Sequence, residues 1–129
     1  MKILITITLF LIQFFAFGQT EQKNYYDNGK LREVGFYDIN NLRTGEWKWY
    51  HENGKLATIE NYNNDKKVGE WKEYSANGQL LEIGSYEDGK EIGEWRKYHE
   101  NGQLLSTGKY ENYDKTGEWK WYHESGQLK

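Results

Sequence analysis

The chain has 129 residues, enough for one modest domain, and a formal net charge of −3 at pH 7 from 17 basic and 20 acidic side chains. This balance gives no electrostatic reason to expect nucleic acid or an anionic membrane as the main partner. Because the sequence contains no cysteine, it excludes disulfides, thiolate metal sites and lipid attachment through a thiol.

Residues 1–18 differ in composition from the rest of the chain. Lys2 precedes an apolar run that ends in the small-x-small triplet Ala16-Phe17-Gly18. A basic start, an apolar centre and such a triplet are typical of a secretory signal peptide. A membrane anchor is the alternative, but a run of about 16 residues is short against the roughly 20 that span a bilayer. We expect cleavage, an extracytoplasmic location (periplasmic, cell-envelope or secreted) and no stable membrane insertion afterwards.

Residues 19–24 carry no periodic signal, and we expect a short flexible lead-in there. A repeat array follows over residues 25–129. Its first copy lacks a GEW motif, so its first strand is expected to be degenerate or to act as a cap. The turn Asn28-Gly29 precedes Asn53-Gly54 by one residue more than the period of the array, and we place the extra residue in the loop 38–44.

The array is defined by the tripeptide GEW, which recurs every 24 residues. A period held over four copies indicates tandem copies of one supersecondary unit. Each copy contains a Trp, a Tyr three places later and a turn Gly. These positions are Trp47, Trp71, Trp95 and Trp119; Tyr50, Tyr74, Tyr98 and Tyr122; Gly54, Gly78, Gly102 and Gly126.

The local chemistry of each unit favours two β-strands. Asn-Gly between two aromatic and β-branched runs is the strongest short-range hairpin signal, because both residues accept the positive φ of a type I′ turn. The junction between units, such as Asp88-Gly89, also has turn chemistry, and no stretch shows the 3.6-residue apolar spacing of a helix. The prediction is an all-β, antiparallel meander of tandem 24-residue hairpins, forming one elongated, twisted sheet.

The length of the Asn-Gly loop decides the strand register. A two-residue loop pairs His51 with Leu56 and places Trp71 opposite Gly84, where an aromatic ring covers a strand glycine. A three-residue loop with a left-handed Gly places Tyr74 beside Leu80 instead. We favour the two-residue loop. In either case the Trp and Tyr of each unit lie on opposite faces of the sheet, so one ring column is buried or a stripe of rings is displayed for binding.

The pattern GEWxxY, NG, Leu and a closing Tyr resembles the MORN repeat family, and in particular its bacterial variant. The resemblance covers about residues 25–129 and implies an elongated array of hairpins. It implies a scaffold or interaction surface, with lipid or protein partners in some members, and some bacterial relatives are labelled as antitoxins of toxin–antitoxin pairs. This chain differs from a cytoplasmic antitoxin in having an export leader. One copy carries the motif in Gly69, Trp71, Tyr74, Asn77, Gly78, Leu80 and Tyr86.

Two sets of repeated polar side chains are better explained as solvent-exposed residues than as metal-binding or catalytic residues. Successive units lie roughly 10 Å apart, too far for their histidines to share a metal ion. The repeated carboxylates each stand beside a basic residue, as expected for a solvated charged face. We predict no catalytic residue, no metal site and no cofactor. The residues are His51, His99 and His123, and Glu46, Glu70, Glu94 and Glu118.

Two functions from different classes fit these observations. The first is a non-catalytic, exported scaffold that binds an unidentified protein partner. The second is a carbohydrate or cell-wall module in which the Trp and Tyr columns stack on sugar or choline-like groups. Rings that face a pocket between hairpins would favour the second, and buried rings would favour the first.

Overall fold

The computed structural model describes residues 18–129, in which all regular structure is β. The predicted signal peptide lies outside this range except for Gly18. Ten strands form one open antiparallel sheet in the order β1-β2-β3-β4-β6-β7-β8-β9-β10, and β5 pairs with β4. The strands are β1 Thr20–Tyr25, β2 Leu31–Tyr37, β3 Arg43–Tyr50, β4 Leu56–Asn63, β5 Lys66–Lys67, β6 Gly69–Tyr74, β7 Leu80–Glu87, β8 Lys90–Tyr98, β9 Leu104–Glu111 and β10 Asp114–Trp121.

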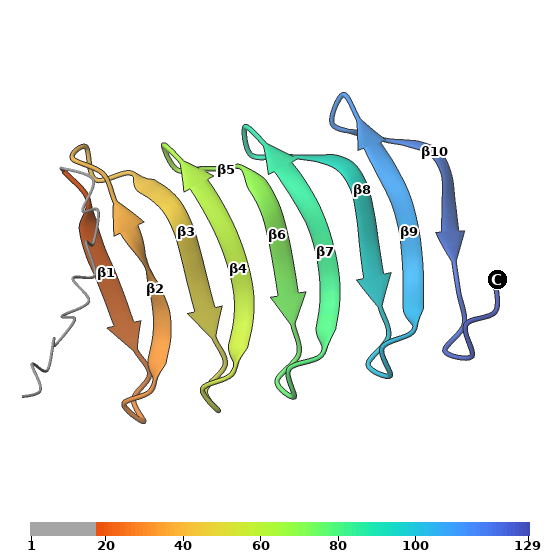
Figure 1. Cartoon of the computed structure of the whole chain (residues 1–129), viewed down its shortest axis with the longest axis horizontal. Helices are drawn as coiled ribbons and strands as arrows, with labels where there is room; N and C mark the ends of the chain where they lie inside the picture. The colour runs from red at the N-terminus through yellow and green to blue at the C-terminus, as the bar shows by residue number, and fades with distance from the viewer. Residues whose placement is uncertain (1–17) are drawn as a thin grey trace, which may run out of the picture.

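The sheet is elongated because hairpins follow one another side by side, and its long axis runs across the strands (Figure 1). Within residues 18–129 no second layer covers either face, so the predicted meander of hairpin repeats is confirmed. The same residues contain no helix long and apolar enough to cross a membrane.

Strand β1 corrects the prediction of a flexible lead-in over residues 19–24. It pairs with β2 from Thr20 opposite Tyr37 to Tyr25 opposite Leu31. The pairing uses backbone groups, which any sequence supplies, so a polar segment with no repeat signal can add to the free edge of a sheet. The array therefore begins with a complete hairpin.

The Asn-Gly turns are three-residue loops, and the predicted type I′ turn is wrong there. His51 donates its backbone N–H to the Lys55 carbonyl at 2.8 Å, Gly54 donates to the His51 carbonyl at 2.8 Å, and Gly54 has φ 90°. Asn53 does not have positive φ. A left-handed glycine closes this loop type and leaves the preceding Asn in an ordinary conformation.

A bulge lies after each Asn-Gly turn. The register predicted for a three-residue loop holds next to the turn, and the register predicted for a two-residue loop holds beyond the bulge. Tyr74 lies opposite Leu80, as the three-residue loop predicts, but Glu73 already lies opposite Glu82. Leu81 is the extra residue, and beyond it Trp71 lies opposite Gly84, as the two-residue loop predicts. The predicted pairing of His51 with Leu56 is wrong, since Tyr50 is the partner of Leu56.

Type I′ turns occur at the other end of the hairpins. Asp88 and Gly89 have φ of 50° and 82° between the paired residues Glu87 and Lys90. In the loop 38–44, Asp38 donates its backbone N–H to the Leu42 carbonyl at 2.9 Å, which makes that loop one residue longer. The extra residue therefore lies where the sequence predicts it.

The glycine of each GEW motif allows a tryptophan to cover the preceding strand. Gly45 has φ 67°, a left-handed conformation that side chains disfavour, and the register between β2 and β3 shifts at this point. The resulting bulge lays Trp47 flat on Gly35. A methyl group at Gly35 would lie 2.1 Å from Trp47 Cδ2, so no larger residue fits while the ring stays in place.

Candidate interaction surface

One face of the sheet, here called the ring face, carries the tryptophans and the closing tyrosines of the repeats. Tyr86 meets Trp95 edge-to-face with ring centroids 5.2 Å apart, and Trp95 meets Tyr110 at 6.1 Å. Rings in such edge-to-face contact attract one another beyond simple burial. The ring face is defined by Trp47, Trp71, Trp95 and Trp119 together with Tyr37, Tyr62, Tyr86 and Tyr110.

The tryptophan column is largely buried although no second layer covers it. Trp47 is 2% exposed and Trp95 is 3% exposed, while Trp71 and Trp119 are half-buried. The neighbouring rings and the glycines beneath them provide this burial, so the indoles form the core of the array. Buried indoles do not present a free platform for a ligand.

Glu60 interrupts the ring face in the second hairpin. It occupies the place that glycine holds in the other repeats and is only 9% exposed. Its carboxylate accepts a hydrogen bond from Trp71 Nε1 at 3.2 Å and one from the Tyr62 hydroxyl, and Lys67 Nζ lies 3.1 Å from it. These contacts satisfy the buried charge, as a carboxylate in a low-polarity position requires.

Two tyrosines on the ring face have a raised pKa, because of burial and the charges and hydrogen bonds around them. Burial and the hydrogen bond to Glu60 raise the pKa of Tyr62, while Arg43 opposes this shift. Burial, with a smaller contribution from the Glu91 charge, raises the pKa of Tyr86 to about 12. Both phenols therefore stay neutral well above the physiological pH range.

The opposite face, here called the charged face, carries the repeated Glu and Lys or Arg side chains. Lys48 Nζ lies 2.8 Å from Glu46, and equivalent ion pairs join Lys72 to Glu70 and Arg96 to Glu94. These acids are exposed, so each pair contributes little to stability. The repeated glutamates form a solvated row and show no arrangement particular to one repeat.

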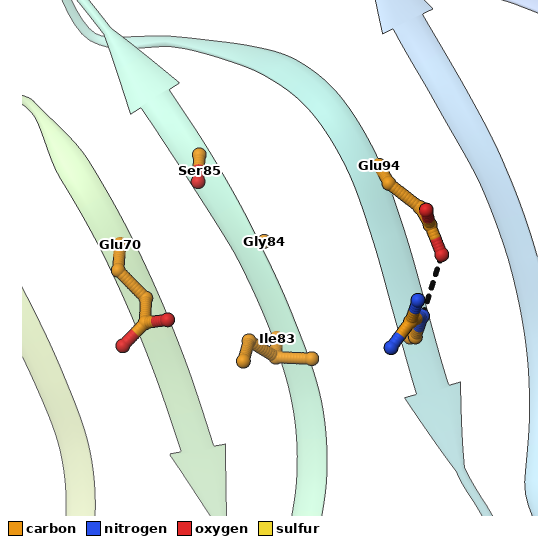
Figure 2. Close-up of a pocket in the computed structure, with 6 residues that line it drawn as sticks. Glu70, Ile83, Gly84, Ser85 and Glu94 are labelled. Carbon is orange, nitrogen blue, oxygen red and sulfur yellow. Dashed lines mark hydrogen bonds and ion pairs between the residues drawn. The ribbon is translucent and has the colours of Figure 1, made fainter.

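The second aromatic column lies on the charged face, as the three-residue spacing predicts. Its members Tyr50, Tyr74, Tyr98 and Tyr122 are all half-buried. A shallow hollow of about 190 Å³ lies on β7 between Glu70 and Arg96, with Ser85 and Glu94 at its rim. Glu94 pairs with Arg96 on the same strand, β8. Figure 2 shows Glu70 on the other side of β7 from Glu94.

The Asn-Gly ends of the hairpins are joined by side-chain hydrogen bonds that the sequence did not predict. His51 Nε2 donates to the Tyr74 carbonyl at 2.8 Å, and His99 Nε2 donates to the Tyr122 carbonyl at 3.0 Å. Asn53 Nδ2 similarly donates to the Ala76 carbonyl at 2.6 Å. His51 and His99 therefore each link one repeat to the next, whereas the sequence suggested surface side chains.

The predicted turn glycines Gly54, Gly78, Gly102 and Gly126 all have positive φ. They shape the loops that carry these links. Within residues 18–129 no group of three or more His, Asp or Glu side chains is placed to hold a metal ion.

The matches to a known family follow the hairpins. The sequence pattern of the MORN repeat variant matches residues 14–38, 43–64, 67–88, 91–112 and 115–129. The chain belongs to the MORN repeat variant family. No curated protein sequence matches it significantly. MORN repeats generally act in protein binding, and the family consists of scaffolds without catalytic activity.

Comparison between the MORN repeats of this chain shows two residues that motif matching missed. Glu60 stands in a column otherwise occupied by Gly35, Gly84 and Gly108, and Glu91 stands in a column otherwise occupied by a cation. Departures from an internal repeat can be read from one sequence. Their consequence depends on which side chains surround them in the sheet.

Proposed function

We propose that this chain is an exported, non-catalytic scaffold whose MORN repeat array presents its surface to a protein partner. The burial of Trp47 and Trp95, at 2% and 3% exposure, is the observation that supports this function best. Buried rings stabilise the array of hairpins. The partner is then recognised by the more exposed side chains around these rings. Export is supported by the leader at residues 1–18.

A single sheet suits a scaffold because its two faces and both rows of turns are accessible. Repeat arrays use such extended surfaces to bind other macromolecules. The charged face bears alternating acids and bases, and the turn ends are polar. Interfaces built from such groups gain specificity and association rate from electrostatic complementarity.

Affinity capture from the envelope extract of the source cells tests the scaffold function. The mature chain should retain a defined protein under mild salt and release it as salt rises, because screening weakens exposed charge contacts. A glycan array probed in parallel should show no binding above background. Retention of a defined glycan and of no protein would contradict the proposal and support a carbohydrate or choline-like module.

Cell fractionation tests export separately. The mature chain, shortened at its N-terminus, should appear outside the cytoplasm. Cytoplasmic protein that retains the leader would contradict export and would favour an antitoxin-type role, in which the partner is a cytoplasmic toxin.

A further inference from the structure

One register position on the ring face carries a cation above a tyrosine in successive hairpins. The guanidinium carbon of Arg43 lies 4.1 Å from the ring centroid of Tyr62. In the next hairpin Lys67 Nζ lies 5.2 Å from the ring centroid of Tyr86. Each cation stands two residues before a GEW glycine and next to the strand that bears the tyrosine. A cation held over a ring in this way is attracted by the ring's electron density.

The following hairpin has a carboxylate at this position. Glu91 stands two residues before Gly93, and Gly93 lies opposite Tyr110, so Glu91 is placed relative to Tyr110 as Lys67 is to Tyr86. Lys115, at the same position in the last copy, again lies over a ring, 4.5 Å from the centroid of Trp119. The fourth hairpin, β8–β9, therefore lacks the cation that the other GEW-containing repeats carry.

Glu91 has no partner of its own in the part of the chain that the structure describes. It is half-buried, and within residues 18–129 it makes no ion pair or side-chain hydrogen bond. Its charge lies close to two phenols, since burial and then the Glu91 carboxylate raise the pKa of both Tyr86 and Tyr110. A half-buried acid next to aromatic rings is best stabilised by a positive charge.

A hollow of about 530 Å³ opens beside Glu91, between the β7–β8 turn and the β9–β10 turn. Its walls include Tyr86, Glu91, Asp114, Lys90 and Tyr113. The acids outnumber the single Lys90, whose Nζ lies 4.2 Å from the ring centroid of Tyr113. The hollow thus already holds one ammonium group against an aromatic ring, and among residues 18–129 neither acid makes an ion pair.

Tyr113 is an unusual residue for its place in the hollow. It has φ 70° in a type I′ turn, at the position that Gly89 and Asp65 fill in other hairpins, and it is 42% exposed. A left-handed conformation is unfavourable for an aromatic residue, and such strain is found preferentially where a side chain serves recognition.

We propose that this hollow binds a lysine or arginine side chain of the protein partner, with its cation against Glu91, between the Tyr86 wall of the hollow and Tyr110 on the neighbouring strand. The bound cation takes the position that Arg43 and Lys67 hold in the earlier hairpins. The inference rests on the proposed scaffold function and identifies which part of the array the partner contacts. A basic protein segment is the expected occupant, because Arg43 and Lys67 are the side chains that provide the cation at the equivalent position in other hairpins.

The substitution Glu91→Lys provides a sharp test, because it restores the cation pattern of the other repeats and should preserve the fold. Glu100→Lys is the matched control: it makes the same charge change at an exposed Asn-Gly turn, at the other end of the hairpins. The probe is a short peptide with lysines separated by glycines, titrated while NMR follows the ring signals of Tyr110 and Tyr113. A glutamate peptide of the same design serves as the negative probe.

The lysine peptide should shift both tyrosine rings in the wild type and in Glu100→Lys. Glu91→Lys should weaken binding by about tenfold or more, the scale of one lost charged contact. Equal binding by wild type and Glu91→Lys, absence of ring shifts in the wild type, or equal binding of the glutamate peptide would overturn the inference. Binding of tetramethylammonium without the lysine peptide would also overturn it and assign the hollow to a small cation.

Partner capture distinguishes failure of this inference from failure of the scaffold function. Wild type and Glu100→Lys should capture the same protein, and Glu91→Lys should lose it. Equal capture by Glu91→Lys would leave the scaffold function intact and remove the hollow from the interface. Capture of no protein by any form would contradict the scaffold function itself.

Discussion

The indole of Trp71 donates its N–H to the buried carboxylate of Glu60 at 3.2 Å, whereas Trp95 lies directly on Gly84. The two tryptophans occupy equivalent positions in adjacent repeats. Edge-to-face contacts of 5.1 to 5.3 Å join a closing tyrosine to the next tryptophan at Tyr37–Trp47, Tyr86–Trp95 and Tyr110–Trp119. Among residues 18–129 the equivalent Tyr62–Trp71 contact is replaced by the polar contacts of Glu60.

The strand that follows β4 is interrupted at Val68, which separates β5 from β6. Thr58 pairs with Glu73 and Ile59 with Lys72 on β6, and β5 adds two further pairs with β4. A side chain at residue 60 prevents Trp71 from lying on β4 as Trp95 lies on β7. Glu60 therefore exchanges ring packing for a local network of hydrogen bonds and one ion pair.

The substitution Glu60→Gly should restore the regular ring contact. We expect its melting temperature to equal or exceed that of the wild type, because a buried ion pair replaced by apolar packing is often neutral or stabilising by about 1–4 kcal/mol. Glu60→Gln is the control, since it keeps the bulk but removes the charge opposite Lys67. It should be less stable than the wild type in thermal denaturation. The prediction is wrong if Glu60→Gly is the less stable of the two variants.

The substitution Gly84→Ala should destabilise the array through a direct clash. A methyl group there would lie 2.2 Å from Trp95 Cδ2, and Trp95 is almost fully buried, so the ring must shift. We expect a loss of about 1–3 kcal/mol or somewhat more, the range for overpacked cores. Ser85→Ala, the next residue and on the charged face, should change stability far less. Equal unfolding midpoints in denaturant for the two variants would contradict the role of the Trp95–Gly84 contact.

The substitution Trp95→Ala should remove a large part of the core. Truncation of a buried tryptophan typically costs about 3–5 kcal/mol. Trp121→Ala is the matched control, because Trp121 is 45% exposed and its loss should have a small effect on melting. Loss of glycan binding by Trp95→Ala with unchanged melting would instead identify this indole as a sugar platform.

Stability should decline at alkaline pH as Tyr86 ionises. Its pKa is raised from 10.0 to about 12, first by burial and then by nearby acids including Glu91. Between these two values the unfolded chain releases the phenol proton while the folded chain keeps it, so stability present below pH 10 is lost as the pH rises toward 12. Tyr86→Phe should show a weaker decline over this interval. The measurement is unfolding by denaturant at a series of pH values, with tyrosinate absorbance to follow the ionisation.

A steeper alkaline decline in Tyr86→Phe than in the wild type would contradict this assignment. Lysine side chains also titrate in this range, so the effect of Tyr86 is measured as the difference in stability decline between the wild type and Tyr86→Phe.

The repeat sequence by itself determined the hairpin meander, the opposite faces of the two aromatic columns and the location of the extra loop residue. These properties arise from local chemistry: a period of 24 residues, glycines where the backbone turns and alternation along each strand. Each acts between residues close in sequence, and repetition makes the signal strong.

Only the tertiary structure decided which rings are buried, which loop type closes the Asn-Gly turns and what Glu60 and Glu91 meet. Asn-Gly suits two turn types, and the bulge at Leu81 that accompanies one of them depends on pairing along the whole hairpin. The polar strand β1 forms because β2 offers it a free edge. Burial of Trp95 likewise requires Gly84 and Tyr110 from two neighbouring strands, because contacts across strands depend on the assembled sheet.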